Sequence, residues 1–204
     1  MGIRQALRIG LLGGTFDPVH TGHLKVAQAA IHELALDTLV WIPANPWQKS
    51  ATADASHRVR LLRLATSGAS KQIIDTSEID RNAPSYTYET VERYRRLYPE
   101  AELYLVIGED QFANFHTWVR FEAILRQTRL AVYARRGAAA PDADFLATLQ
   151  KLNQSPIRLK ADAFDVSSTA IREAFRSGHG EECFKKGLLP ENVYTYIVNQ
   201  HLYR

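Results

Sequence analysis

The sequence predicts an α/β fold: a doubly wound, Rossmann-like, mostly parallel sheet with helices on both faces. Two observations support this prediction. Short runs rich in aliphatic and β-branched residues recur along the chain, and stretches with helical spacing of apolar residues lie between them. Because a strand, a helix and a further strand join through a right-handed crossover, this alternation indicates parallel pairing.

Six segments are predicted as strands. They are short, apolar and bounded by polar residues, glycine or proline. In chain order they are Arg8–Leu12, Thr38–Pro43, Gln72–Thr76, Glu102–Gly108, Arg129–Arg135 and Pro156–Ala161.

Helices are predicted where apolar residues recur on one face. After the first strand, that face consists of Leu24, Ala27, Ile31 and Leu34. A later helix has Thr87 as its predicted N-cap and Glu89 in its first turn, and another begins at Pro190. Two polar or small-residue stretches, Asn45–Ser56 and Arg136–Asp142, are predicted as loops.

Length and composition fit one domain spanning residues 1–204. Of the 204 residues, 46% are hydrophobic and 23% are charged, which excludes disordered, collagen-like and repeat-dominated chains. The net charge of +3 is too small to indicate a nucleic-acid partner, although local placement can still bind a small anion. Cys183 is the single cysteine, so we expect no disulfide and a reducing, cytoplasmic setting. The chain has neither a signal-peptide core nor a long apolar run, so we expect no membrane partner.

The segment Gly13–His23 follows the first strand, where open α/β sheets bind ligands. Its sequence, GGTFDPVHTGH, is neither the dinucleotide fingerprint nor the P-loop. Paired glycines let backbone amides approach a phosphate, Thr15 adds a hydroxyl, and a helix entrance follows. His20 and His23 stand at that entrance, so both imidazoles can point into one anion site. Taken singly, these parts also fit a simple turn, two surface histidines or a weak metal site.

A second helix entrance lies far along the chain, at Val166–Arg172. The local pattern predicts a helix with Ser167 or Ser168 as its N-cap and Arg172 one turn inside. Free amides, hydroxyls and a guanidinium at one helix N-terminus suit a phosphate chain, although alone they would form an ordinary capped helix. Two such entrances in one domain favour a site for a nucleoside triphosphate.

Together, the two segments resemble the G-G-x-F-D-P-x-H-x-G-H and I-S-S-T-x-I-R elements of the nucleotidyltransferase superfamily that carries the H-x-G-H motif. Val166 replaces the usual Ile of the second element. The resemblance implies catalytic roles for His20, His23 and Arg172. It implies ATP contacts at Gly13, Gly14, Thr15, Phe16, Ser167, Ser168 and Thr169.

A third segment, Ile79–Val91, carries the tetrapeptide Pro84–Thr87. Exposed amides at a helix start favour a carboxylate. Asp80 and Arg81 could merely form a surface ion pair, and Ser85–Thr87 could simply cap the helix. The segment resembles the P-S-Y-T-x-x-T element of bacterial nicotinate-nucleotide adenylyltransferases, which implies that the backbone of Ser85, Tyr86 and Thr87 recognises the nicotinate carboxylate.

The end of the fourth strand fits the G-x-D…W pattern of the same family. The resemblance implies that Gly108 and Asp110 approach the adenosine and that Trp118 stacks on the pyridine ring. An isolated Trp more often packs in a core.

The loop after the second strand departs from the family, which commonly ends it in His-Lys or His-Arg. Here Gln48 precedes Lys49, so the histidine contact is missing while Lys49 retains a cation for ATP. Lys49 also fits a solvated loop charge. Arg135, at the end of the fifth predicted strand, is assigned to the nicotinate nucleotide, facing the phosphates.

The resemblance implies adenylyl transfer from ATP to nicotinate mononucleotide, giving nicotinate adenine dinucleotide and pyrophosphate. Mg²⁺ would accompany ATP, bound through its phosphates and water, with no dedicated metal site in the protein. The attacking phosphate oxygen is already ionised near neutral pH, so no general base is required. Two alternatives stay open: an adenylyltransferase for phosphopantetheine or nicotinamide mononucleotide, and a regulator that binds nucleotide without turnover. The oligomeric state is open too, with a homodimer compatible with the sequence.

Overall fold

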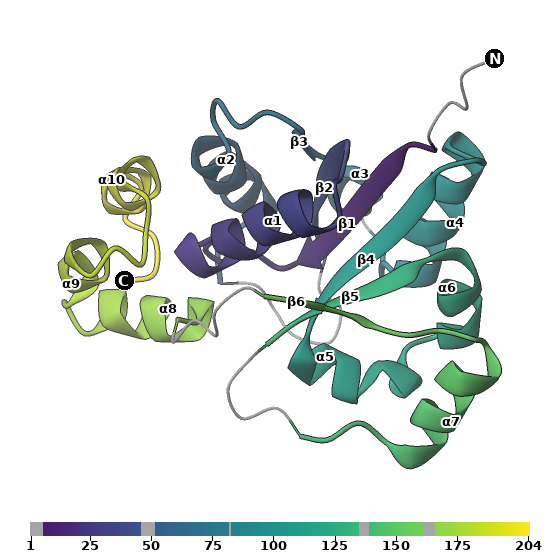
Figure 1. Ribbon diagram of the computed structural model, residues 1–204. Coiled ribbons are helices and arrows are strands. Elements are labelled where there is room, and N and C mark those ends of the chain that lie inside the picture. The colour runs from purple at the N-terminus through teal and green to yellow at the C-terminus, as the bar shows by residue number, and fades with distance from the viewer. Residues whose placement is uncertain (1–5, 46–51, 82, 135–138, 161–165) are drawn as a thin grey trace.

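The computed structural model describes residues 6–45, 52–81, 83–134, 139–160 and 166–204. Its centre is a six-stranded sheet in the order β3-β2-β1-β4-β5-β6, with each neighbouring pair parallel (Figure 1). The strands are β1 (Arg8–Gly14), β2 (Thr38–Pro43), β3 (Gln72–Ile74), β4 (Glu102–Gly108), β5 (Arg129–Tyr133) and β6 (Ile157–Leu159). This strand order is that of a doubly wound sheet, so the predicted fold class is confirmed.

The predicted strands differ from the observed ones mainly at their ends. β2 and β4 have the predicted bounds, whereas β1 continues to Gly14 because Gly13 and Gly14 still pair with β2. The edge strands β3 and β6 are shorter than predicted, because only three residues of each find partners on the neighbouring strand. β5 ends at Tyr133, where its partner strand β4 also ends.

Helices fill the connections between the strands. They are α1 (Thr21–Glu33), α2 (Ala55–Ala65), α3 (Ser77–Asp80), α4 (Thr87–Leu97), α5 (Glu109–Ala113), α6 (Phe121–Gln127), α7 (Ala143–Lys151), α8 (Ser168–Arg176), α9 (Gly180–Lys185) and α10 (Glu191–Asn199), with a 3₁₀ turn η1 at Phe115–Thr117. The predicted loop to Ser56 is wrong at its end, because α2 already begins at Ala55. The predicted N-cap Thr87 is wrong by one residue: Tyr86 is the N-cap and Thr87 opens the helix.

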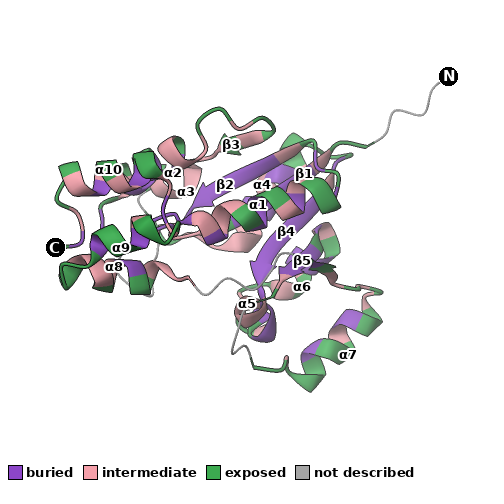
Figure 2. Cartoon of the chain, turned by 60° about the vertical axis from the view of Figure 1, so that its left-hand side comes forward, coloured by how far each residue is buried: buried purple, intermediate pink, exposed green. Residues whose placement is uncertain are grey.

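Alternate residues of the central strands face two separate cores. Ile9 and Leu11 of β1 pack with α4–α7, whereas Leu12 packs with α1, α2 and the helices α8–α10. A Cβ on Gly10 would lie 2.5 Å from Leu36 Cδ1, so glycine lets the α1–β2 connection lie directly against β1. Figure 2 shows the central strands largely buried, the edge strand β3 more exposed, and the helices buried along their inner sides.

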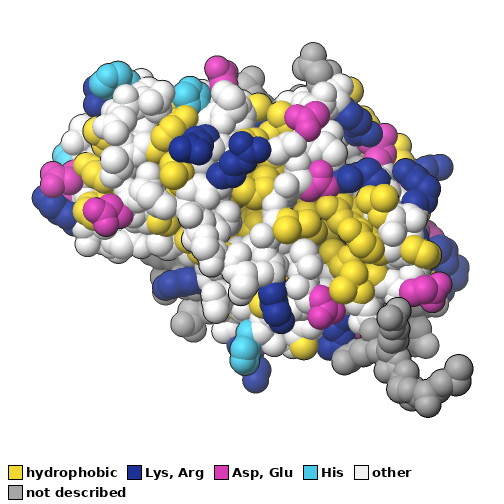
Figure 3. Space-filling model, turned by 90° about the horizontal axis from the view of Figure 1, so that it is seen from above, with side chains coloured by type: hydrophobic (Ala, Val, Ile, Leu, Met, Phe, Trp, Pro, Cys, Tyr) yellow, Lys and Arg dark blue, Asp and Glu magenta, His cyan; other side chains and the backbone are white. Residues whose placement is uncertain are grey.

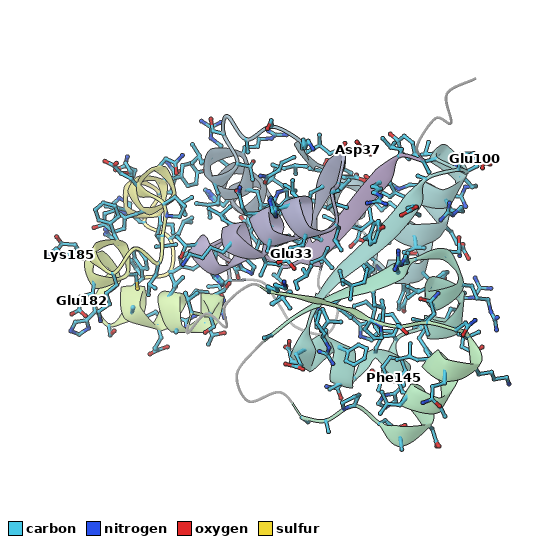
Figure 4. The ribbon with its side chains drawn as sticks, in the orientation of Figure 1. Glu33, Asp37, Glu100, Phe145, Glu182 and Lys185 are labelled. Atoms are coloured by element: carbon cyan, nitrogen blue, oxygen red, sulfur yellow. The ribbon has the colours of Figure 1, made fainter. Side chains whose placement is uncertain are left out.

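Aromatic packing fixes the segment that follows β4. Phe145 of α7, labelled in Figure 4, lies with its ring centroid 5.3 Å from that of Phe112 and 5.8 Å from that of Phe115. Phe115 in turn lies 4.8 Å from the Trp118 ring. The core beneath α5 and η1 therefore sets the position of Trp118.

Charged groups of both signs occur on the surface seen from above in Figure 3, placed around an area of hydrophobic side chains. Within the described ranges, no helix is both long enough and apolar enough to cross a membrane.

Candidate functional site

A cavity of about 550 Å³ opens beyond the carboxyl ends of β1 and β4, the neighbours at which the strand order reverses. Its walls come from the segment Gly13–His23, called the signature segment below, and from the entrances of α4, α5 and α8. The sequence-predicted residues that line it are Gly13, Gly14, Thr15, Phe16, His20, His23, Ser85, Thr87, Asp110, Trp118, Ser167, Ser168, Thr169 and Arg172. The structure thus brings all three motifs to one site.

Two histidines stack at the entrance of α1. His20 is the N-cap residue, and its ring centroid lies 3.7 Å from that of His23, with 23° between the ring planes. The His20 amide donates a hydrogen bond of 3.2 Å to His23 Nδ1, so a neutral His23 carries its proton on Nε2. An Nε2–H group is a donor that suits an anionic acceptor. A Cβ on Gly22 would lie 2.9 Å from Val166 and 3.0 Å from the His20 ring, so this stacking requires glycine.

Phe16 supports the histidines from the core side. Its side chain is 2% exposed, and its ring meets His23 edge-on at 5.1 Å and Trp41 at 5.3 Å. Its φ of 50° lies in the left-handed region, which non-glycine residues adopt at a cost. A ligand could therefore reach the backbone of Phe16 but little of its ring.

Asp17 and Arg58 hold the backbone of the signature segment, and sequence reasoning assigned neither a role. The Asp17 carboxylate is 3% exposed, and Arg58 is 2% exposed. Arg58 Nη1 donates to the carbonyl oxygens of Thr15 at 2.8 Å and Ala44 at 3.0 Å. Burial lowers the pKa of Arg58, and the nearby Asp17 partly offsets that effect. Asp17 belongs to the quoted motif, but the sequence does not show that its side chain is buried and accepts hydrogen bonds from the protein.

The entrance of α8 docks on the signature segment. Ser167 is the N-cap, as predicted, with its side chain accepting from the Ala170 amide at 3.1 Å. Ser168 Oγ donates to the carbonyl oxygen of Pro18 at 2.9 Å, across 150 positions of sequence. Arg172 Nη1 donates to the carbonyl oxygen of Asp17 at 2.7 Å, while its Nε lacks a hydrogen-bond partner among the residues that the structure describes. The guanidinium thus ties the two motifs together, and its Nε–H is left unpaired among the described residues.

An ion pair between Arg81 and Glu89 lies at the entrance of α4. Glu89 accepts from the Tyr86 amide at 3.4 Å and from Arg81 at 2.6 Å. The hydrogen bond from Arg81 holds the pKa of Glu89 below its usual value. Tyr86 lines a neighbouring hollow that shares Ser85 and Thr87 with the main cavity. Ser85 and Thr87 of the predicted carboxylate-binding segment thus line the main cavity, whereas Tyr86 lines the neighbouring hollow.

Glu78 and Thr90 are lining residues that sequence reasoning missed. Thr90 Oγ1 donates to Glu78 Oε1 at 2.6 Å, and Ser85 Oγ donates to the Glu78 carbonyl oxygen at 3.2 Å. Burial raises the pKa of the Glu78 carboxyl, which the hydrogen bond from Thr90 partly opposes. Glu78 lies just outside the quoted motif, and the sequence carries no signal that would bring it into the cavity.

The remaining predicted residues fall outside the cavity lining or outside the described ranges. A Cβ on Gly108 would lie 2.5 Å from Asp110 Oδ1 and 3.2 Å from the Tyr133 hydroxyl, so glycine there permits close packing behind the lining. Lys49, with Gln48, and Arg135 lie outside the described residues. No group of three or more His, Cys, Asp or Glu side chains in the described ranges is placed to hold a metal ion.

Comparison with known proteins gives consistent matches over nearly the whole chain. Residues 11–174 match the family model described as Cytidylyltransferase-like. A Bordetella petrii protein named "Probable nicotinate-nucleotide adenylyltransferase" is 42% identical over 201 residues, which cover 97% of this chain and 99% of that protein. A Methylibium petroleiphilum protein of the same name is 39% identical over 199 residues, covering 96% of this chain and 92% of that protein.

Among solved structures, Plasmodium falciparum nicotinic acid mononucleotide adenylyltransferase complexed with NaAD superposes with a TM-score of 0.78. The two chains are 18% identical, and the superposition covers 97% of each. At that identity, the match supports the fold and carries no residue assignments.

Proposed function

Because this chain belongs to the cytidylyltransferase-like family, and within it to the nicotinate-nucleotide adenylyltransferases, we propose roles for its residues in the reaction of that group. The chain transfers the adenylyl group of ATP to nicotinate mononucleotide, forming nicotinate adenine dinucleotide and pyrophosphate, a step of NAD biosynthesis. The proposed roles rest on one observation: the entrances of α1 and α8, the stacked pair His20 and His23, and Arg172 all lie around one cavity.

The ATP triphosphate lies between the signature segment and the entrance of α8. Both entrances present backbone amides and positive dipole ends, which favour phosphate oxygens. His20, His23 and Arg172 are the catalytic residues, because they donate to the phosphates as negative charge builds on the leaving pyrophosphate. Gly13 and Gly14 keep the backbone clear for that approach.

The reaction is an in-line displacement at the α-phosphorus of ATP. A bond forms between that phosphorus and a phosphate oxygen of the mononucleotide, while the bond to the oxygen bridging the α- and β-phosphates breaks. Holding the two substrates in line can contribute about 7–11 kcal/mol. Each well-aimed charge contact can add about 3–4 kcal/mol. No side chain has to remove a proton from the nucleophile.

The nicotinate nucleotide occupies the other end of the cavity. The backbone around Ser85, Tyr86 and Thr87 receives the carboxylate, and Trp118 stacks on the pyridine ring. Gly108 and Asp110 approach the adenosine, Gly108 through backbone alone. Lys49 and Arg135 supply further cations to the phosphates of ATP and of the mononucleotide, respectively.

Mg²⁺ enters as part of the ATP substrate. The chemistry calls for a cation on the phosphates, and Mg²⁺ keeps several waters when it binds phosphate. We therefore assign Mg²⁺ to the phosphate oxygens of ATP and to water molecules, and not to side chains that line the cavity. A homodimer and a cytoplasmic location stay predictions, the first to be checked by light scattering.

The test is pyrophosphate release from ATP with three acceptors in parallel: nicotinate mononucleotide, nicotinamide mononucleotide and phosphopantetheine. We expect strong preference for the first. An amide would set its own N–H donors against the donors at the α4 entrance, at about 1–3 kcal/mol for each unmatched group. Equal use of the acid and the amide would overturn the assignment of nicotinate. If the protein binds ATP but releases no pyrophosphate with any of the three acceptors, it is instead a nucleotide-binding regulator.

A further inference from the structure

The turn after α10 reaches back to the signature segment. Tyr203, in that turn, is 5% exposed, and its hydroxyl donates a hydrogen bond of 2.8 Å to Asp17 Oδ1 across 186 positions of sequence. Its ring belongs to the same core cluster as Phe16 and Val19 of the signature segment. Figure 1 shows α8, α9 and α10 gathered beside one end of the sheet.

The Asp17 carboxylate is a junction of separate chain segments. Oδ2 accepts from the Thr52 amide at 2.6 Å, and Oδ1 accepts from the Ala53 amide at 3.1 Å as well as from Tyr203. The Asp17 carbonyl oxygen accepts from Arg172 of α8. One residue therefore links the signature segment, the chain entering α2, the entrance of α8 and the turn after α10.

The turn is held in an uncommon backbone conformation. Tyr203 has φ of 65° and His201 has φ of 53°, both in the left-handed region. Such conformations persist where the surroundings determine them more strongly than local preference. For Tyr203 those surroundings are Asp17 and the packed ring of Phe175, whose centroid lies 6.4 Å away.

The hydroxyl of Tyr203 acts as a donor. Burial raises the pKa of Tyr203, and the adjacent Asp17 carboxylate raises it further, so the hydroxyl keeps its proton. Three donors then face the buried carboxyl group of Asp17, a residue that lines the cavity assigned to the triphosphate. Removing one of these donors would weaken the hydrogen bonding of the Asp17 carboxyl group. The backbone of the signature segment would then be free to shift together with Asp17.

We propose that Tyr203 is a positioning residue for ATP, acting through Asp17 on the backbone of the signature segment. This inference rests on the proposed function, which places the triphosphate at that segment. Among the partners of Asp17, Arg172 lines the cavity at the entrance of α8, the end assigned to ATP, whereas Ser85 and Trp118 line the end assigned to nicotinate. Loss of the Tyr203 hydroxyl should therefore affect ATP binding and turnover while sparing the affinity for nicotinate mononucleotide.

The experiment compares Tyr203→Phe with Tyr196→Phe. Tyr196 is the matched control, because its hydroxyl bonds His57 Nδ1 at 3.0 Å and so joins α10 to α2 without touching the signature segment. For both variants we would measure kcat, both KM values, the unfolding midpoint, and binding of α,β-methylene-ATP by calorimetry. We expect Tyr203→Phe to lower kcat/KM for ATP about tenfold and to weaken the analogue similarly. Its KM for nicotinate mononucleotide should stay within about twofold of the wild type, and Tyr196→Phe should resemble the wild type in every substrate constant.

Three results would overturn the proposal: wild-type constants in Tyr203→Phe, equal effects in both variants, or lower kcat with both KM values and analogue binding unchanged. The last pattern would report only a smaller folded fraction. If Tyr203→Phe does not fold, Asp17→Asn tests the same junction, because one amide oxygen can no longer accept both from Tyr203 and from the Thr52 amide as the two carboxylate oxygens do. If the wild type binds the ATP analogue but does not use nicotinate mononucleotide, the proposed acceptor substrate is wrong. The positioning role of Tyr203 still stands in that case if Tyr203→Phe lowers the affinity for the analogue.

Discussion

Asp75 connects the end of β3 to α4, the helix whose entrance we propose binds the nicotinate carboxylate. It accepts hydrogen bonds from Arg93, from the Tyr94 hydroxyl at 2.7 Å and from the Ser77 amide at 3.0 Å, and its side chain is 13% exposed. Burial alone would raise the pKa of Asp75. The hydrogen bonds from Arg93, Ser77 and Tyr94 outweigh that effect and lower the pKa to about 2.

The magnitude follows from linkage between protonation and folding. A fall in the pKa of Asp75 from 3.8 to about 2 corresponds to about 2 kcal/mol of stability at neutral pH. Because the folded-state pKa is depressed, this contribution is fully present above the unfolded-state value and is lost as pH falls toward the folded-state value. About half of it should remain near pH 3.

The assay is urea unfolding of the wild type and Asp75→Asn between pH 7 and pH 3. We expect the variant to be less stable by about 2 kcal/mol at pH 7, with the difference narrowing to about 1 kcal/mol at pH 3. Asp80→Asn is the control, because Asp80 is exposed and, among the residues that the structure describes, accepts a hydrogen bond from Thr76 Oγ1 alone, at 2.7 Å. A wild-type-to-variant difference that does not change with pH would refute the reasoning, because the carboxylate charge would then not be its source.

Three further outcomes test the site. His20→Ala and His23→Ala should each lower kcat about 10²–10³-fold with little change in the unfolding midpoint, and near-normal turnover in both would remove the histidines from the mechanism. Gly22→Ala should lower kcat about tenfold or more, because the added Cβ would lie 2.9 Å from Val166 and 3.0 Å from the His20 ring. A wild-type rate would show that the stacked rings of His20 and His23 adjust freely. Trp118→Ala should raise KM for the acid and the amide mononucleotide in similar proportion, since both rings offer the same face, and a selective loss for the acid would give Trp118 a role in discrimination.

Much of the fold could be predicted because its sequence signals are local. Buried parallel strands such as β2 and β4 are short apolar runs, and their bounds matched. The helix α2 was missed because its buried face includes the polar residue Arg58, which the apolar pattern treats as exposed. The short edges β3 and β6 were overextended, since the number of paired residues depends on the neighbouring strand.

The candidate site could be predicted only where its residues form a recognisable string. The signature segment and the entrances of α4 and α8 do so, and the structure brings them together at one cavity. Arg58 and Tyr203 enter the site region through hydrogen bonds to residues 43 and 186 positions away, and Glu78 enters it through contacts with Ser85 and Thr90. No spacing rule in a single sequence encodes such contacts, so these residues required the structure.

The hydrogen bonds around the signature segment also bear on the order of events in folding. They join residues 150, 155 and 186 positions apart, whereas β1, α1 and β2 are neighbours in sequence. Closing long chain segments has a larger entropic cost, so distant pairings form late compared with local ones. A refolding chain should regain its far-ultraviolet dichroism before it regains affinity for ATP. Nucleotide binding would then be the last property to appear, and a partly folded chain would sequester no nucleotide.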